Sequence, residues 1–151
     1  MSTQNYFLIK DSNKQIKINN IDDLNNFIAH SSDIYETDIS GQTLLHYICS
    51  FGTEDMIIFL AEKYPSLINS KSNDGSTPLH SICSTKNKLK AVEYLINKGA
   101  DINAMDKNKY KPFHYAIKYN NLSLIDMFIA HGAYVDYMAL MIVQTMPNYL
   151  L

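Results

Sequence analysis

The sequence contains no arginine, and all thirteen of its strongly basic residues are lysines. Base edges in DNA are usually read by the bidentate arginine guanidinium, so this absence argues against sequence-specific nucleic-acid recognition. The longest apolar run, residues 137–143, is much shorter than the roughly 18 residues that a membrane span requires. No secretory signal is visible near the start of the chain. We therefore expect a soluble cytoplasmic protein that does not bind membranes.

Cysteine is also scarce. Cys49 and Cys83 both lie in apolar helical patterns, which indicates a reducing compartment rather than a disulfide framework. Each follows a histidine by three positions, in the pairs His46–Cys49 and His80–Cys83. Such pairs could supply a four-ligand zinc site or a Cys/His nucleophile. A third copy of the pattern has Ile117 at the cysteine position, which favours apolar packing, although a cluster across adjacent helices stays geometrically possible.

Motifs for catalysis are missing as well. The chain has no glycine-rich phosphate loop, no G-x-S-x-G sequence and no carboxylate pair in a catalytic context. The acidic pairs at 22–23 and 54–55 stand at expected helix starts, where carboxylates complement the helix dipole. The sequence therefore predicts a protein without enzymatic activity, cofactor or metal.

What the sequence does contain is a repeat with a period of 34 residues. Three segments start at Asp38, Ser72 and Asp106: DISGQTLLHYICSFG, SNDGSTPLHSICSTK and DKNKYKPFHYAIKYN. Each is followed by a second apolar pattern of helical period, such as LKAVEYLINKGADIN. A helix pair of this kind cannot bury its apolar face alone, so neighbouring pairs are expected to stack into one core.

Residues with strong positional preferences mark the expected helix ends. Threonine suits the N-cap, proline suits the first turn, and glycine just past the last turn suits a left-handed C-terminal cap. These residues are Thr43, Thr77, Pro78, Pro112, Gly99 and Gly132.

The segments GSTPLHSIC and KGADINAMD resemble the ankyrin repeat, whose signature is T-P-L-H-x-A at a period near 33. The resemblance covers roughly residues 21–136 and implies a mainly α solenoid of helix-turn-helix units with hairpin loops. It also implies that the signature histidines, His46, His80 and His114, bond to the backbone of the neighbouring hairpin loop. The third repeat departs from the family at Lys109, where glycine is usual, and at Lys111, where the capping threonine is usual. The form of its hairpin and cap is therefore open, and Lys111 becomes a candidate for binding.

The two ends differ from the repeats. Residues 4–18 alternate around a turn-rich tetrad and predict a small N-terminal β-hairpin, and the stripe that begins at Ile21 resembles half a repeat. We expect a capping segment at 1–37, repeats at 38–71, 72–105 and 106–136, and a capping helix or tail at 137–151. The apolar tail either covers the last repeat or provides an interface for self-association or for more chain.

The resemblance implies a protein-interaction scaffold that binds through its hairpin tips and the exposed side of each first helix. The expected partner-binding residues are Phe51, Lys71, Met105, Lys107, Tyr110, Lys118 and Tyr119. One alternative is binding of nucleic acid or another acidic surface by the second half of the chain. Residues 1–80 contain five lysines and ten acidic residues, whereas residues 81–151 contain eight lysines and five acidic residues. Another alternative is a pathogen or viral effector that binds a host protein in the host cytosol.

Overall fold

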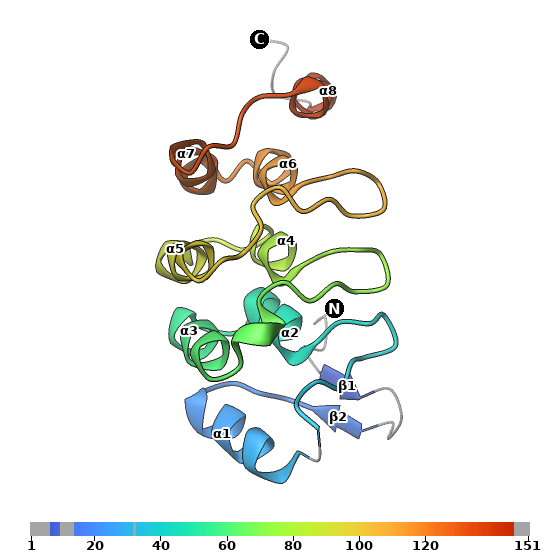
Figure 1. The fold of residues 1–151 in the computed structure, drawn as a ribbon, viewed down its shortest axis with the longest axis vertical. Helices are drawn as coiled ribbons and strands as arrows, with labels where there is room; N and C mark the ends of the chain where they lie inside the picture. The colour runs from blue at the N-terminus through green and yellow to red at the C-terminus, as the bar shows by residue number, and fades with distance from the viewer. Residues whose placement is uncertain (1–6, 10–13, 32, 147–151) are drawn as a thin grey trace.

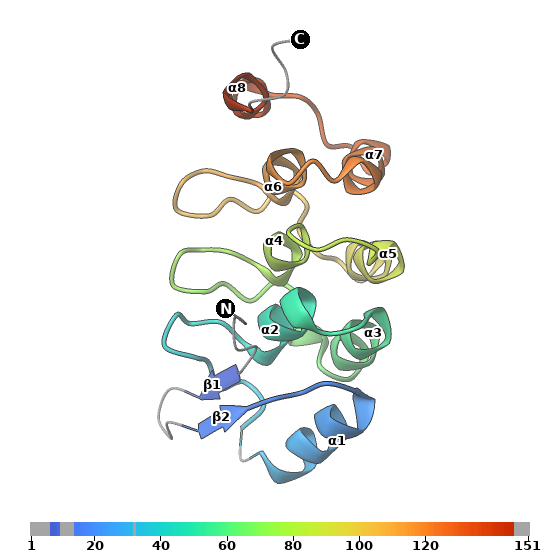
Figure 2. The ribbon, with the colours of Figure 1, turned by 180° about the vertical axis from the view of Figure 1, so that it is seen from behind.

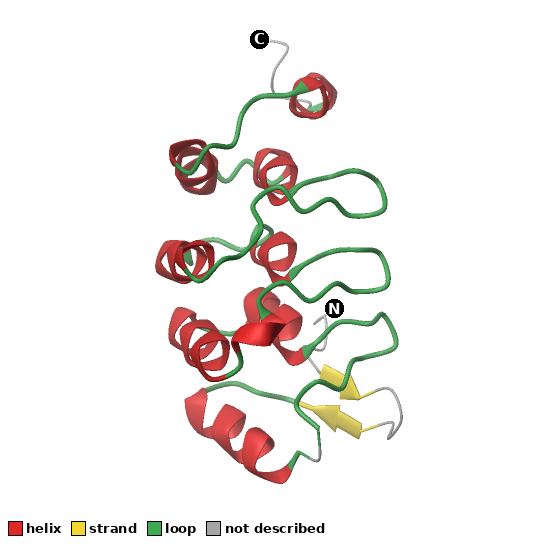
Figure 3. Ribbon diagram, viewed as in Figure 1, coloured by secondary structure: helices red, strands yellow, loops and turns green. Residues whose placement is uncertain are grey.

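The computed structural model describes residues 7–9, 14–31 and 33–146. Its helices form two layers, and the hairpin loops between successive helix pairs project to one side (Figure 1). The inner helices, next to the hairpins, are α2 (Leu44–Phe51), α4 (Pro78–Ile82) and α6 (Pro112–Lys118). The outer helices are α3 (Glu54–Lys63), α5 (Leu89–Asn97) and α7 (Leu122–Ala130), and a 3₁₀ turn at Pro65–Leu67 follows α3. The expected mainly α solenoid with hairpin loops is confirmed (Figure 3).

Helix α5 shows why these segments are helical. Ala91, Val92 and Leu95 are buried at helical spacing, and the opposite side of the helix carries exposed charged residues. The helix ends where Gly99 takes a φ of 95°, which lets the Ala100 N–H reach the Leu95 carbonyl at 2.9 Å. Outer helix α7 ends in the same way, at Gly132 with a φ of 96°.

A separate cap covers the N-terminal end of the array. Strands β1 (Phe7–Ile9) and β2 (Lys14–Ile16) form an antiparallel hairpin that lies below α2, beside helix α1 (Ile21–His30) (Figure 2). Phe7 is buried, and its ring centroid lies 5.7 Å from that of Tyr47 in α2. Residues 4–6 and 10–13 of the expected hairpin lie outside the described residues. The hairpin thus takes the position of an inner helix, while α1 packs on the outer helix α3.

The three hairpin loops have the same backbone structure. In the first, the Gly41 N–H donates to the Asp38 carbonyl at 3.0 Å with Gly41 at a φ of 72°. In the third, the Lys109 N–H donates to the Asp106 carbonyl at 3.0 Å with Lys109 at a φ of 67°. The lysine therefore adopts the left-handed conformation that glycine adopts more easily, and the doubt about this hairpin is removed.

Helix α8 (Tyr137–Thr145) follows the third repeat without an intervening hairpin. Residues 98–111 connect α5 to α6 and include a hairpin, whereas the shorter segment 131–136 connects α7 to α8. Helix α8 packs on α6 and continues the inner layer (Figure 1). None of the helices in the described part of the chain combines the length and apolarity needed to cross a bilayer.

Candidate functional site

Buried histidines join each repeat to the next hairpin. The Nε2–H of His46 donates to the Ser76 carbonyl at 2.9 Å, and that of His80 donates to the Tyr110 carbonyl at 3.0 Å. In His46 the other ring nitrogen accepts the Thr43 N–H at 3.1 Å, and Thr77 makes the same bond to His80 at 3.0 Å. One nitrogen donates and the other accepts, so each ring is neutral with its proton on Nε2. Burial lowers the pKa of both histidines, although the bond to the carbonyl acts in the opposite direction.

The third histidine has a different partner. His114 does not bond to a hairpin carbonyl as expected, because no hairpin precedes α8. Its Nε2 lies 2.8 Å from Oδ1 of Asp136, and the Lys111 ammonium donates to Oδ2 of the same carboxylate at 3.1 Å. Lys111 is therefore used within the molecule and is not free for a partner. Burial alone would raise the pKa of Asp136, but hydrogen bonds from the Ala139 N–H, His114 and Lys111 hold this pKa at about 2.

The surface between the hairpins and the exposed side of the inner helices is here called the concave face, and most of the expected partner-binding residues belong to the hairpins and inner-helix ends that border it. Phe51 at the end of α2, Met105 beside the third hairpin and Tyr119 after α6 are 51%, 50% and 46% exposed. The expected lysines of this face are also exposed: Lys71, Lys107 and Lys118. Their side chains are available to a partner.

Tyr110 does not fit the expectation that it is an aromatic residue the core does not need. Its side chain is partly buried against the core, and its ring centroid lies 6.0 Å from that of His114 and 5.7 Å from that of Tyr115. Its carbonyl also accepts the bond from His80 at 3.0 Å. Tyr110 therefore contributes to the junction between the second and third repeats.

The sequence interpretation missed Tyr115, on the concave side of α6. Its ring stacks on that of Tyr119, with centroids 6.5 Å apart and planes at 20°. Its hydroxyl donates to Oδ2 of the buried Asp106 at 2.6 Å, and burial is the main cause that raises its pKa. A sequence signal was available, since the repeat places Tyr115 at the same position as Tyr47 and Ser81.

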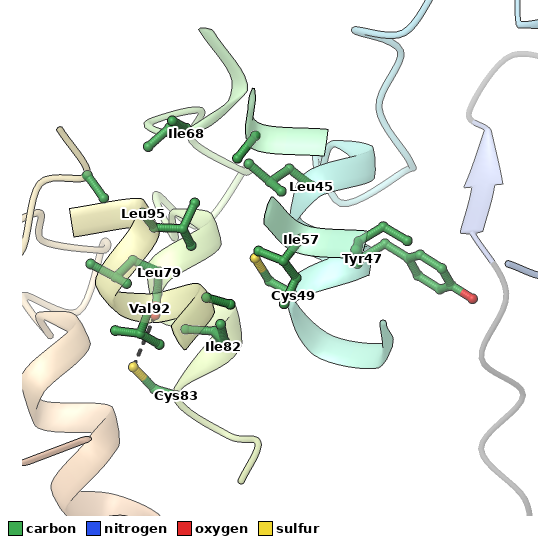
Figure 4. Packing of buried hydrophobic residues seen from close by; sticks show 14 of the residues in the cluster. Leu45, Tyr47, Cys49, Ile57, Ile68, Leu79, Ile82, Cys83, Val92 and Leu95 are labelled. Atoms are coloured by element: carbon green, nitrogen blue, oxygen red, sulfur yellow. Dashed lines mark hydrogen bonds between the residues drawn. The ribbon is translucent and has the colours of Figure 1, made fainter. Parts of the chain in front are cut away.

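The two cysteines lie in the apolar core. Cys49 and Cys83 have no exposed surface, and Figure 4 shows them among Ile57, Ile82 and Val92. Burial raises the pKa of Cys49 to about 12 and raises that of Cys83 as well, so both are uncharged thiols at neutral pH. Within residues 7–9, 14–31 and 33–146, no group of three or more histidine, cysteine or acidic side chains is placed to hold a metal ion.

Lys88, in the lysine-rich half, also serves the fold. Its ammonium donates to the Cys49 carbonyl at 3.0 Å and so caps the C-terminal end of α2. Burial lowers its pKa, while the Glu54 carboxylate acts in the opposite direction. In return, the Glu54 carboxylate accepts the Ala91 N–H at the start of α5 at 3.0 Å. The free basic surface is therefore smaller than the lysine count suggests.

The repeats match a family model described as ankyrin repeats in three copies, over residues 14–106 and 64–139. The chain belongs to the ankyrin repeat family. Ankyrin repeats generally mediate protein–protein interaction, and the family is generally non-enzymatic.

Several known proteins share the repeats. The chain is 28% identical over 102 residues to the ankyrin repeat protein FPV223 of fowlpox virus strain NVSL, a match that covers 68% of this chain and 70% of the viral protein. It is 29% identical over 92 residues to target of rapamycin complex 2 subunit AVO2 of Saccharomyces cerevisiae, covering 61% of this chain and 21% of that protein. It is 33% identical over 85 residues to human ankyrin repeat domain-containing protein 53, covering 54% of this chain and 16% of that protein. The chain thus spans most of the viral relative but a small part of the two cellular ones.

Proposed function

We propose that this chain is a protein-binding scaffold without catalytic activity, and that its partner contacts the concave face. The observation that carries the proposal is that Phe51, Met105 and Tyr119, at the hairpins and inner-helix ends that border that face, are about half exposed, and that Ile39 at the first hairpin is 72% exposed. Large apolar side chains that gather on one surface are typical of protein interfaces, and aromatic residues often supply most of the binding energy.

Backbone hydrogen bonds between adjacent hairpins support the proposal further. The Asn73 N–H donates to the Ser40 carbonyl and the Lys107 N–H donates to the Asp74 carbonyl, each at 2.8 Å, so adjacent hairpins are bonded to each other. A surface that is already ordered before binding loses less conformational entropy when the partner arrives. Residues separated by a full repeat can therefore act on one partner together.

Affinity capture followed by measurement of binding tests this proposal. The chain is immobilised, proteins are captured from the native cell type, and the affinity of the captured partner is compared between variants. Phe51→Ala combined with Tyr119→Ala should weaken binding at least about tenfold, because each anchor is worth more than about 1 kcal/mol. Leu122→Ala is the matched control, since Leu122 is 64% exposed at the start of outer helix α7. Unchanged affinity in the double variant would place the interface elsewhere.

The similarity to the fowlpox virus protein supports a more specific version, in which the partner is a host protein met in the host cytosol. This match covers 70% of the viral relative, so the two chains share most of that protein's length. Capture from host-cell extract tests it with the same two variants. A partner found only in the producing organism and not in a host would contradict this version.

The lysine-rich second half supports a second candidate, an acidic partner such as nucleic acid. Lys107 and Lys118 are exposed on the concave face, and rim charges of this kind mainly increase the association rate. If DNA were the partner, the logarithm of its affinity would fall linearly with the logarithm of salt concentration. Lys107→Glu with Lys118→Glu should reduce that slope, whereas a salt-independent affinity would exclude this candidate.

The C-terminal end supports a third candidate, self-association. Tyr137, Leu140 and Met141 of α8 are 73%, 51% and 41% exposed, and Ile129 of α7 is 48% exposed. Apolar side chains gathered at one end of a solenoid provide a stacking surface. Sedimentation of the chain and of a Leu140→Glu variant tests this, and a monomer at every concentration would rule it out.

A further inference from the structure

The concave face is indented at the second repeat. Helix α4 has five residues, whereas α2 has eight and α6 has seven. The residue after the signature histidine is Tyr47 in α2 and Tyr115 in α6, but it is Ser81 in α4. Ser84 follows beyond the end of α4, where its hydroxyl donates back to the Ser81 carbonyl at 3.1 Å. A short helix with small side chains therefore lies between two longer helices that carry tyrosines.

This indentation is a notch of about 220 Å³. Its lining includes Ser81, Ser84 and the neutral His80 of the second repeat, Tyr115 and Tyr119 of the third, and Asp74 of the second hairpin. Pockets for small molecules typically enclose roughly 300–1,000 Å³. The notch is smaller than these pockets and suits a single side chain.

The charge of the lining favours a cation. Among the described residues that line the notch, Asp74 carries a charge and none is a lysine. A hydrogen bond from the Ser72 hydroxyl, assisted by bonds from Ser76, lowers the pKa of Asp74, so this carboxylate is ionised at neutral pH. The carboxylate of Asp106 lies behind the lining and accepts the Tyr115 hydroxyl.

The aromatic part of the lining favours a cation too. The ammonium of Lys118 lies 5.9 Å from the ring centroid of Tyr115, so that ring already has a cation over it, and the ring of Tyr119 is the one left for a partner. Tyr119 itself is 46% exposed. A guanidinium group stacks on aromatic rings and carries five N–H donors, which match the carboxylate and hydroxyl oxygens of the notch.

We infer that the notch binds a basic side chain, arginine more tightly than lysine, presented by an extended segment of the partner protein. This inference rests on the proposed function, because it names the residue type that the partner inserts into the concave face. It also gives Lys107 a separate role, since this lysine does not line the notch and then acts on the parts of the partner outside it.

The test uses three short glycine–serine peptides that differ only in a central arginine, glutamine or glutamate, titrated into the ¹⁵N-labelled chain. The arginine peptide should shift the amide signals of Ser81 and Ser84, and the glutamate peptide should not. Asp74→Asn should weaken this binding about threefold to fivefold, the effect of losing one partly exposed ion pair. Asp101→Asn is the matched control, because Asp101 is also an exposed turn aspartate that accepts the N–H two residues ahead, and it lies outside the notch.

A second variant fills the notch. Ser81→Tyr introduces the residue that the first and third repeats have at this position, so the fold should tolerate it while arginine binding is lost. Three outcomes would overturn the inference. The arginine peptide could bind Ser81→Tyr and Asp74→Asn as well as the unaltered chain, or the glutamate peptide could bind as well as the arginine peptide. The third outcome is that no peptide shifts the signals of Ser81 and Ser84. With a captured partner the two proposals separate: loss of affinity in Tyr119→Ala but not in Ser81→Tyr rejects the notch alone, and no loss in either variant rejects the concave face.

Discussion

The third repeat is joined to its two neighbours in different ways. Toward the second repeat, the His80 ring donates to a backbone carbonyl of the third hairpin, and the two hairpins bond to each other through Lys107 and Asp74. Toward α8, the hairpin is missing and a side chain takes its place, with the Asp136 carboxylate accepting from both His114 and Lys111. The same histidine geometry thus serves a junction with a hairpin on one side of the third repeat and a junction without a hairpin on the other.

This difference explains the unusual residue at the third cap. Lys111 has no hydroxyl, so the third repeat lacks the group that Thr43 and Thr77 place 2.9 Å from their histidines. It provides instead a positive charge for Asp136, whose side chain is 20% exposed. Lys111 and Asp136 therefore act as a pair, and this pair suits a repeat that is followed by a helix without a hairpin before it.

The largest expected effect comes from the interior of the array. Leu95 has no exposed surface and lies in α5, which packs between α3 and α7. Leu95→Ala should lower the free energy of unfolding by about 2–5 kcal/mol. Ile142→Ala in α8 should cost less, near the lower end of this range, because α8 packs on α6 at the end of the array. Chemical denaturation measures both, and equal losses would show that the end of the array is as tightly packed as its middle.

The next effect concerns the carboxylate at the terminal junction. Asp136→Asn removes the charge that holds the Lys111 ammonium, which is only 15% exposed, and weakens the bond from His114. We expect a loss of about 1.5–3 kcal/mol, the usual worth of hydrogen bonds to a charged group. Asp126→Asn, an exposed aspartate on α7, should leave the unfolding free energy unchanged. A comparable loss in that control would mean that net charge, and not the junction, is responsible.

The two kinds of junction should respond to acid in different pH ranges. Folding lowers the pKa of His46 and His80 below 6.5, so the unfolded chain binds protons first and stability decreases as the pH falls below about 6.5. Asp136 has a pKa of about 2 in the fold against 3.8 otherwise, so its contribution is full above about pH 4 and is lost as the pH falls toward 2.

Denaturation at a series of pH values measures these two losses. The loss of stability between about pH 4 and pH 2 should amount to about 1–2 kcal/mol after allowance for the partial exposure of Asp136. Asp136→Asn should still lose stability as the pH falls below about 6.5, but it should lack the further loss between about pH 4 and pH 2. A variant with the same acid profile as the unaltered chain would contradict the assignment.

The smallest expected effect tests the lysine. Lys111→Thr loses the ion pair with Asp136 but restores the hydroxyl that the first two repeats place beside their histidines. These changes oppose each other, so the unfolding free energy should change by less than about 1 kcal/mol. In combination with Asp136→Asn, Lys111→Thr should recover part of the loss, because no buried ammonium then lacks its partner. Strictly additive effects would show that the two residues are not coupled.

Much of the fold could be predicted because the sequence repeats itself. The 34-residue spacing of the segments TLLH, TPLH and KPFH predicts which helices are inner and which are outer. The resemblance to ankyrin repeats adds the bonds that His46 and His80 make to the next hairpin. These features depend on short-range patterns that recur every 34 residues. The number of layers and their stacking follow from them.

The terminal junction could not be predicted in the same way. His114 and Asp136 lie in different elements, and only the structure shows that the loss of a hairpin brings them together. The candidate site could likewise be predicted only in part. The exposure of Phe51 and Tyr119 agrees with the repeat pattern, whereas the partial burial of Tyr110 depends on rings contributed by α6. Side-chain contacts between repeats that differ from the consensus carry no periodic signal in a single sequence.

The most direct test of this account is amide hydrogen exchange in the unaltered chain and in Asp136→Asn. If the carboxylate closes the array, the variant should exchange faster in α8, Tyr137–Thr145, and at the adjoining turns of α6, while α2, Leu44–Phe51, keeps its protection. Unchanged exchange in α8, or equal acceleration in every helix, would contradict the claim that Asp136 replaces the missing hairpin at the end of the array.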